Sequence, residues 1–187
     1  KVKDRYEIDF DNYGVVIFHP VTTELEHLQS HIDTLMKAIV NSQKNYVVIY
    51  PNNDHGSEII FKSYEEIEKN EHFRIFPSMR FEYFLQLLKN ADFMIGNSSA
   101  GVREAPHFGV PTINLGTRQN NRVSFSSITN VDFDETKILN AIKDIGNQNY
   151  EKASIFGDGN SAEKFYEILQ KQNFWTMAKQ KFFVDLN

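Results

Sequence analysis

The fold of this chain is decided by one stretch of sequence, Ala91-Asp92-Phe93-Met94-Ile95-Gly96-Asn97-Ser98-Ser99-Ala100-Gly101-Val102-Arg103-Glu104-Ala105-Pro106. Its apolar start predicts a buried strand, and its second half predicts a helix that ends before Gly109. A strand, a turn of small residues and a helix start leave backbone N–H groups unpaired where the helix dipole is positive. The stretch therefore predicts an anion site, to which the hydroxyls of Ser98 and Ser99 add further donors.

Glu104 extends this prediction from an anion to a nucleotide. It lies roughly 7 Å beyond Ser99 along a helix, which rises about 1.5 Å per residue. This is about the separation between a diphosphate and a ribose, and a carboxylate accepts hydrogen bonds from a pair of ribose hydroxyls. A plainer interpretation makes Ser98 or Ser99 an N-cap and Glu104 a first-turn charge that faces the dipole. On this segment alone both interpretations stay open.

Segments typical of strands and helices alternate along the rest of the chain. Apolar runs predict strands at 13–18, 46–50, 72–76, 91–95 and 112–115, with a weaker strand at 127–131. Helical patterns follow at about 25–39, 57–69, 81–88, 101–108 and 138–145, and two more close the chain at 162–169 and 174–183. Ahead of the first of these helices, Thr23 and Glu26 are spaced as a capping box. The alternation predicts an α/β fold with a doubly wound, Rossmann-like parallel sheet, because each crossover must return the chain to the same edge.

Composition narrows the classes of function. A net charge of −5 and the lack of a Lys/Arg stripe argue against a general affinity for nucleic acid. Cysteine is absent, which removes disulfides, thiolate metal sites and cysteine nucleophiles and fits a reducing compartment. No apolar run approaches the roughly 20 residues of a membrane span, and no secretory signal is recognisable. We therefore expect a soluble, cytoplasmic protein with neither nucleic acid nor membrane as a partner.

Polar residues follow several of the predicted strands. In open parallel sheets, ligands bind outside the carboxyl ends of the strands, where loops and helix N-termini converge. The residues at these ends are His19 after the first strand, Asn52 and Asn53 after the second, Ser98 and Ser99 after the fourth, and Thr117, Arg118 and Gln119 after the fifth. Each has an ordinary explanation, since Asn and Thr form turns and a loop Arg is usually solvated. Their common edge favours a binding site.

His19 and Arg118 at this edge each have two interpretations, and a second pair of histidines could bind a metal. His19 is either a structural residue bonded to the backbone or a donor to a phosphate or sugar. Arg118 either is solvated or neutralises a diphosphate through its planar fork. His27 and His31 are four residues apart on a helix, a spacing that can chelate, but no acidic residue completes a zinc-protease pattern. We interpret that pair as a solvated face and expect neither a metal nor a cofactor.

Four motifs, in order, resemble the hydrolysing UDP-N-acetylglucosamine 2-epimerases. They are His19-Pro20-Val21-Thr22-Thr23-Glu24, Tyr50-Pro51-Asn52-Asn53-Asp54, the stretch from Gly96 to Pro106, and Gly109-Val110-Pro111-Thr112-Ile113-Asn114-Leu115-Gly116-Thr117-Arg118-Gln119, with Gly157-Asp158-Gly159-Asn160 similar as well. The resemblance implies a glycosyltransferase-B-type fold of two Rossmann-like halves that face a cleft. It makes residues 1–187 the C-terminal, UDP-binding half, a single domain with closing helices from about 160 and without the N-terminal half.

The same resemblance implies roles for particular residues. Ser98 and Ser99 would bind the diphosphate, Glu104 the ribose, and His19, Asn52 and Arg118 the nucleotide sugar around the phosphates. The loop at 79–81 would contact uracil. The acid and base that act at C2 of the sugar belong to the N-terminal half in this family. We therefore expect no certain catalytic residue here, with His19 the one candidate, and a chain that is inactive alone.

The implied reaction converts UDP-N-acetylglucosamine, or a diamino-sugar analogue, to N-acetylmannosamine, or its analogue, plus UDP. It belongs to bacterial sialic-acid-type pathways, and the intact enzyme would be a homo-oligomer. Pro20-Val21-Thr22 and Ser98-Ser99-Ala100-Gly101 argue against the non-hydrolysing epimerases, which carry an Arg-rich segment and a Ser-Gly-Gly loop there. His55 and Asn121 stand where we expect smaller residues in many relatives. We therefore expect the neighbouring loops to differ in shape, so the identity of the sugar in the substrate is not decided by the resemblance. Three alternatives remain: the donor domain of a glycosyltransferase, a non-catalytic UDP-sugar-binding module, and a purely structural domain.

Overall fold

Six parallel strands form one sheet in a computed structural model that describes residues 1–145 and 150–180. The strands are β1 (Gly14–Ile17), β2 (Tyr46–Ile49), β3 (Phe73–Phe76), β4 (Phe93–Gly96), β5 (Thr112–Leu115) and β6 (Ile128–Val131). Their order across the sheet is β3-β2-β1-β4-β5-β6, and every neighbouring pair is parallel. The order reverses between β1 and β4, as in a doubly wound sheet. The predicted α/β class and Rossmann-like sheet are confirmed.

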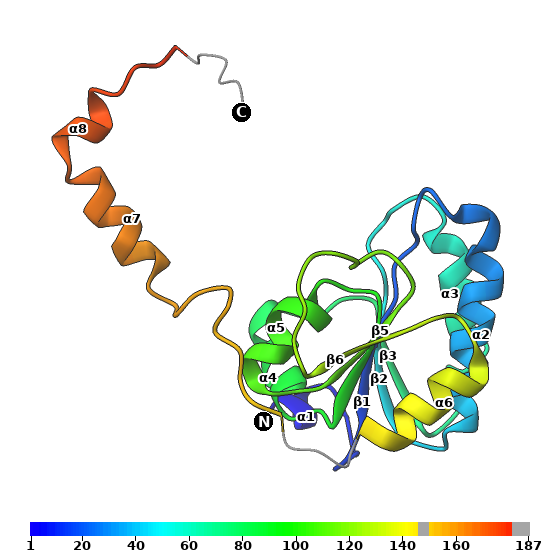
Figure 1. Cartoon of the computed structure of the whole chain (residues 1–187). Coiled ribbons are helices and arrows are strands. Elements are labelled where there is room, and N and C mark those ends of the chain that lie inside the picture. Colours follow the sequence, from blue (N-terminus) through cyan, green and yellow to red (C-terminus); the bar gives the residue numbers. More distant parts are fainter. Residues whose placement is uncertain (146–149, 181–187) are drawn as a thin grey trace. The chain divides into compact units, whose positions relative to one another are not determined.

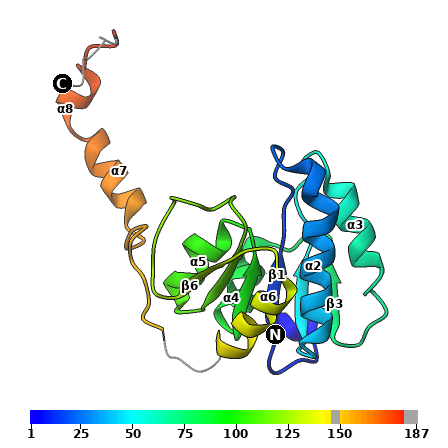
Figure 2. The same ribbon diagram turned by 45° about the vertical axis from the view of Figure 1, so that its right-hand side comes forward.

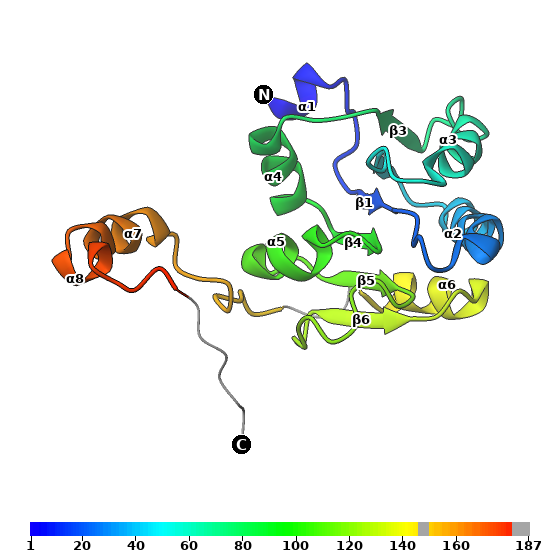
Figure 3. The same cartoon turned by 90° about the horizontal axis from the view of Figure 1, so that it is seen from above.

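Helices cover both faces of the sheet (Figures 1 and 3). One face carries α2 (Leu28–Asn41), α3 (Ser57–Glu65) and α6 (Glu135–Asp144), with α2 between the other two (Figure 2). The opposite face carries α1 (Val2–Arg5), α4 (Phe81–Lys89) and α5 (Ala100–Phe108). A short 3-10 turn, η1 (Leu25–His27), precedes α2. The short helix α1 has no counterpart among the helices that the sequence predicts.

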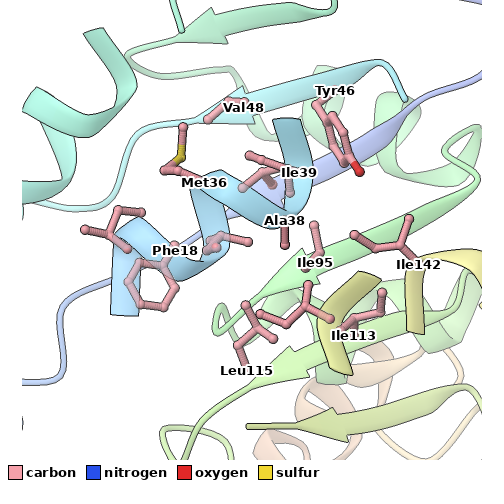
Figure 4. Close-up of a cluster of buried hydrophobic side chains, with 14 of the residues drawn as sticks. Phe18, Met36, Ala38, Ile39, Tyr46, Val48, Ile95, Ile113, Leu115 and Ile142 are labelled. Atoms are coloured by element: carbon pink, nitrogen blue, oxygen red, sulfur yellow. The ribbon is translucent and has the colours of Figure 1, made fainter. Parts of the chain in front are cut away.

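Alternate strand residues feed two separate hydrophobic cores. Val16, Val48 and Ile95 belong to the core under α2 and α6, whereas Val15 and Met94 belong to the core under α4 and α5. Successive side chains of a strand point to opposite faces, so a strand covered by helices on both sides must be apolar throughout. Figure 4 shows the first of these cores, in which side chains of α2 pack against those of the strands. This is why continuous apolar runs, and not alternating ones, predict these strands.

The strand register brings the carboxyl ends together. Ile17 of β1 pairs with Ile49 of β2 on one side and with Gly96 of β4 on the other. Gly96 in turn pairs with Asn114 of β5. The segments that leave β2, β1, β4 and β5 therefore start side by side at one edge of the sheet. This is the edge at which the sequence predicts a binding site.

The start of α2 differs from the prediction. The capping box of Thr23 and Glu26 is not formed: α2 begins only at Leu28, and its N-cap residue, His27, makes no capping bond with its side chain. The backbone N–H of Glu24 bonds to the carbonyl oxygen of Val21 and closes a turn there. The Glu24 carboxylate accepts a hydrogen bond from the hydroxyl of Thr117. Glu24, an acidic residue just before the helix, is therefore bonded to a residue that is distant in the sequence.

The chain divides into two compact units, Lys1–Ala153 and Ser154–Asn187. The second contains α7 (Ser161–Leu169), close to the helix predicted at 162–169, and α8 (Gln172–Trp175). The helix predicted at 174–183 is wrong at its start, and its end lies outside the described residues. That residues 1–187 form one UDP-binding domain stays a prediction. Across the described residues, every helix is too short or too polar to cross a bilayer.

Candidate functional site

Gly96 sets the path of the chain as it leaves β4. Its φ of +134° lies in a region that favours glycine, and a Cβ atom there would overlap the carbonyl oxygen of Ile17 in the neighbouring strand. This close approach lets the next residue, Asn97, donate its backbone N–H to the same Ile17 oxygen at 3.2 Å. The two strands thus remain paired up to the point at which the chain turns toward α5.

The side chain of Asn97 joins the ends of β1 and β4. Its Oδ1 accepts a hydrogen bond from the backbone N–H of His19 at 2.7 Å, and its Nδ2 donates to the carbonyl oxygen of His19 at 2.8 Å. Asn97 is 1% exposed and His19 is 7% exposed. Buried polar groups without partners are costly, and here all four groups have one.

The backbone carbonyl of Asn97 faces the loop that follows β5. It accepts hydrogen bonds from Nη1 of Arg118 at 3.1 Å and from Nε2 of Gln119 at 2.7 Å. Gln119 is buried, and its Oε1 has no hydrogen-bond partner among the described residues. Three loops, those after β1, β4 and β5, are therefore tied to one residue.

The ring of His19 is held from the loop after β2. The backbone N–H of Asn52 donates to Nδ1 of His19 at 3.4 Å. An N–H can donate only to an unprotonated ring nitrogen, so the neutral ring carries its proton on Nε2. Burial above all, together with the positive charge of Arg118, lowers the pKa of His19 to about 4, while the negative charge of Asp54 acts in the opposite direction. His19 is therefore neutral at pH 7, with Nε2–H as a donor.

Arg118 is half-buried at this edge. Burial lowers its pKa, the neighbouring charge of Arg122 does the same, and Asp54 opposes both. Guanidinium groups stay protonated in proteins, so Arg118 carries a positive charge here. Desolvation of that charge would be offset by an anionic ligand, as expected of an Arg that neutralises phosphates.

Ser98 and Ser99 lead into α5, whose N-cap residue is Ser99. Ser98 is buried and its Oγ accepts a hydrogen bond from the backbone N–H of Ala100 at 3.3 Å, whereas Ser99 makes no capping bond with its side chain. Gly101 brings this helix start close to β5, because a Cβ atom there would lie 2.6 Å from Cγ2 of Thr112. The N-terminus of α5, with its positive dipole, lies at the carboxyl edge of the sheet because the helix begins at Ala100, soon after β4 ends at Gly96.

Glu104 does not fit the plainer interpretation of this segment. The first turn of α5 holds no acidic residue, and Glu104 stands in the second turn, half-buried. A carboxylate gains from the dipole mainly within the first turn. The interpretation of Glu104 as a first-turn charge is therefore wrong, and acceptance from ribose hydroxyls stays a prediction.

Asn97 bonds both His19 and Arg118, and Asn52 joins them through its bond to the ring of His19. Ser98 and Ser99 directly follow Asn97. In the loop after β3, Met79 is half-buried and Arg80 is the N-cap of α4, and contact of this loop with uracil stays a prediction. Sequence reasoning placed Gln119 at this edge, but it gave no role to Gln119, Asp54 or Asn97. Each directly follows or lies near the end of a strand, which is the signal that could have found them.

His27, the N-cap residue of α2, and His31, within α2, are in different surroundings. His27 is exposed, and its ring centroid lies 5.9 Å from that of His31. His31 is half-buried and stacks on the ring of Phe133 at 3.8 Å, so the predicted solvated face holds for His27 only. Within the described residues, no group of three or more His, Cys, Asp or Glu side chains is arranged to hold a metal ion.

A family model described as UDP-N-acetylglucosamine 2-epimerase matches residues 1–170. The chain belongs to the UDP-N-acetylglucosamine 2-epimerase family. The four motifs that carry the resemblance in the sequence all lie inside the matched residues. In this epimerase-family chain each of them includes residues that closely follow a strand at the carboxyl edge of the sheet.

Two curated relatives of the epimerase family are similar to this chain. A protein of Neisseria meningitidis serogroup B named UDP-N-acetylglucosamine 2-epimerase is 43% identical over 191 residues, which cover 100% of this chain and 50% of the relative. A protein of Legionella pneumophila named UDP-N,N'-diacetylbacillosamine 2-epimerase (hydrolyzing) is 30% identical over 168 residues, which cover 89% of this chain and 45% of the relative. The chain thus spans about half the length of the curated relatives it matches.

A solved epimerase structure has the same fold. The UDP-GlcNAc 2-epimerase of Methanocaldococcus jannaschii, in complex with UDP-GlcNAc and UDP, matches with a TM-score of 0.70. The match covers 90% of this chain and 48% of that one at 20% identity. At this identity the likeness supports the Rossmann-like fold of this epimerase-family chain.

Proposed function

We propose that this chain is the UDP-binding half of a hydrolysing UDP-N-acetylglucosamine 2-epimerase with a glycosyltransferase-B-type fold. Membership of the epimerase family supports it. The observation that carries it is the set of hydrogen bonds at the switch point of the sheet, where Asn97 holds His19 and Arg118 beside the start of α5. A neutral imidazole donor, a guanidinium and a helix N-terminus at one point form a set of donors suited to a diphosphate.

The proposed roles are those that the resemblance to the family implies. Ser98, Ser99 and the N-terminus of α5 bind the diphosphate, and Glu104 accepts from the ribose. His19, Asn52 and Arg118 contact the nucleotide sugar around the phosphates. When the bond between the sugar and the diphosphate breaks, negative charge grows on the leaving UDP. Donors already held in place stabilise that charge without having to reorganise.

The chemistry at the sugar needs more than this chain. Inversion at C2 requires a base that removes a proton there, and hydrolysis requires a water molecule that replaces UDP at C1. We assign these roles to the other half of a longer enzyme, and we expect the chain to be inactive alone. The substrate is UDP-N-acetylglucosamine or a diamino-sugar analogue, and the products are N-acetylmannosamine or its analogue plus UDP. The name of the Legionella relative supports the hydrolysing reaction. A cytoplasmic homo-oligomer that serves sialic-acid-type biosynthesis completes the proposal.

Calorimetric titration of the 187-residue chain with UDP tests the proposal, with GDP and ADP as controls. Selective binding of UDP supports a uridine-nucleotide site. Equal affinity for the three nucleotides, or none for UDP, contradicts it. The full-length enzyme is then supplied with UDP-N-acetylglucosamine and its products are analysed. Release of N-acetylmannosamine and UDP is the expected result, whereas turnover only with an added acceptor would indicate a glycosyltransferase. UDP binding without any turnover would indicate a non-catalytic module.

A further inference from the structure

We propose that Asn97 is a positioning residue for the diphosphate, because it holds His19 and Arg118 in one fixed arrangement. This inference rests on the proposed function and adds to it a residue that does not itself need to touch the nucleotide. Asn97 links three segments that are distant in sequence, the ends of β1, β4 and β5. Its side chain bonds His19 after β1, and its backbone carbonyl bonds Arg118 after β5.

The side-chain amide of Asn97 takes the place of a peptide unit. The pairing of β1 with β4 ends with the hydrogen bond from Asn97 N–H to the carbonyl oxygen of Ile17. Beyond this point the two chains separate, and the N–H and carbonyl of His19 would lack partners. The side-chain amide of Asn97 offers an oxygen that accepts and an NH2 group that donates, and it bonds both backbone groups of His19. The ladder is thereby continued by one residue, which fixes the backbone of His19 on both sides of its Cα.

A fixed backbone at His19 also fixes its ring. The direction of the Cα–Cβ bond follows from the backbone, and the bond from Asn52 N–H to Nδ1 sets the rotation of the imidazole. The Nε2–H group is then aimed in one direction before any ligand arrives. Donors held in advance bind a ligand at a smaller entropic cost than donors that must first be ordered.

The carbonyl of Asn97 positions the second donor. Nη1 of Arg118 donates to it at 3.1 Å, which uses one of the five N–H bonds of the guanidinium and leaves the others for a ligand. Nε2 of Gln119 donates to the same oxygen from the buried side. A displacement of Asn97 therefore moves both His19 and Arg118. Loss of its side chain should weaken contacts to phosphate and leave contacts to the nucleoside in place.

A double-mutant cycle on the whole chain tests whether Asn97 acts through His19. UDP is titrated into the wild type, Asn97→Ala, His19→Ala and the double variant. We expect Asn97→Ala to weaken UDP binding about tenfold in the wild type and less than about twofold when His19 is already Ala, because contacting residues of one network are not additive. An equal loss in both backgrounds would overturn the inference. If the wild type itself does not bind UDP, the proposed function fails first.

Asn114→Ala is the matched control. Asn114 is 2% exposed, lies on the next strand, and donates from Nδ2 to Oδ1 of Asn130 at 2.8 Å. The Asn114→Ala variant thus also loses a buried side-chain amide, but this amide bonds neither His19 nor the loop of Arg118. We expect its affinity for UDP to stay within about twofold of the wild type. A loss as large as that of Asn97→Ala would mean that any buried amide of this sheet matters, and would overturn the inference.

A second measurement does not depend on UDP or on the folding of Asn97→Ala. In Asn97→Asp, Oδ1 still accepts from His19 N–H, but no donor remains for the carbonyl of His19. Nitrogen NMR of the ring reports which nitrogen carries the proton. We expect a single Nε2–H tautomer in the wild type and in Asn114→Ala, and a mixture of tautomers in Asn97→Asp. The same single tautomer in all three proteins would show that Asn97 does not position the ring.

Discussion

The backbone N–H of Asn52 donates to Nδ1 of His19 at 3.4 Å, so the loop after β2 fixes the ring of a residue that follows β1. The bond gives His19 a structural part and a binding part at once. Nδ1 accepts a hydrogen bond that holds the ring within the fold, and Nε2–H is the donor that we assign to the ligand. The two interpretations of His19 offered by the sequence are therefore compatible, one for each ring nitrogen.

Acidification should destabilise the fold through His19. Its pKa is lowered from 6.5 to about 4, so the unfolded chain binds the proton more tightly than the folded one. The contribution of the neutral ring is complete above about pH 6.5 and is lost as the pH falls toward 4. At pH 5 the loss is about 2 kcal/mol. Urea unfolding at pH 7.5 and pH 5.0 should show a smaller drop in stability for His19→Asn than for the wild type. An equal drop would contradict the burial of a neutral ring.

Arg118→Ala should weaken UDP binding by about 1–3 kcal/mol without unfolding the domain, the usual cost of losing a charged hydrogen-bond partner. The loss should be largest for UDP, smaller for UMP and smallest for uridine. The control is Arg122→Ala, which removes an exposed neighbouring charge that influences the pKa of Arg118. A similar loss in both variants, or no dependence on the number of phosphates, would assign the effect to general charge instead.

Glu104→Gln should weaken the binding of UDP by about 1 kcal/mol, since a carboxylate accepts hydrogen bonds more strongly than an amide. The 2',3'-dideoxy form of UDP lacks the ribose hydroxyls and should bind the wild type and the variant alike. Glu58→Gln, which changes an exposed acid in the first turn of α3, is the control and should leave both affinities unchanged. If the dideoxy nucleotide is as sensitive to Glu104→Gln as UDP is, the carboxylate does not bind the ribose.

Gly96→Ala should destabilise the fold by about 3 kcal/mol or more, because its φ is positive and its Cβ would overlap the backbone of Ile17. Gly157→Ala separates the two causes. Gly157 has a φ of +118°, but no atom lies within 4 Å of a Cβ added there. We expect a cost of about 1–2 kcal/mol for this variant. Thermal unfolding of both proteins measures the difference, and similar midpoints would mean that the β1–β4 approach tolerates a methyl group.

Much of the fold follows from the sequence because the central strands β2, β1, β4 and β5 are buried on both faces over all or nearly all of their length. Runs such as Tyr46–Ile49 and Phe93–Gly96 are apolar throughout. Such runs are typical of strands in the interior of a sheet that helices cover on both faces. The edge that gathers His19 and Arg118 follows from the same alternation, since parallel strands all end on one side.

The rest depended on contacts between distant segments. The amide of Asn97 looks like an ordinary turn residue until His19, 78 residues earlier, is seen to lie against it. The tautomer of His19 depends on Asn52, and the carboxylate of Glu24, beside the capping box that is not formed, is bonded by Thr117, 93 residues away. Local patterns carry no information about such partners.

The strand order also affects how the protein is made. β1 lies at the centre of the sheet but is synthesised before its two neighbours. The segments that meet at Asn97 extend from His19 to Gln119, so a ribosome working at about 5–20 residues per second needs roughly 5–20 seconds between them. During this interval the nascent chain exposes unpaired strand edges that other chains can capture. The edge at which we propose nucleotide binding is incomplete until Gln119 has been synthesised, so a bound nucleotide cannot shorten that exposure.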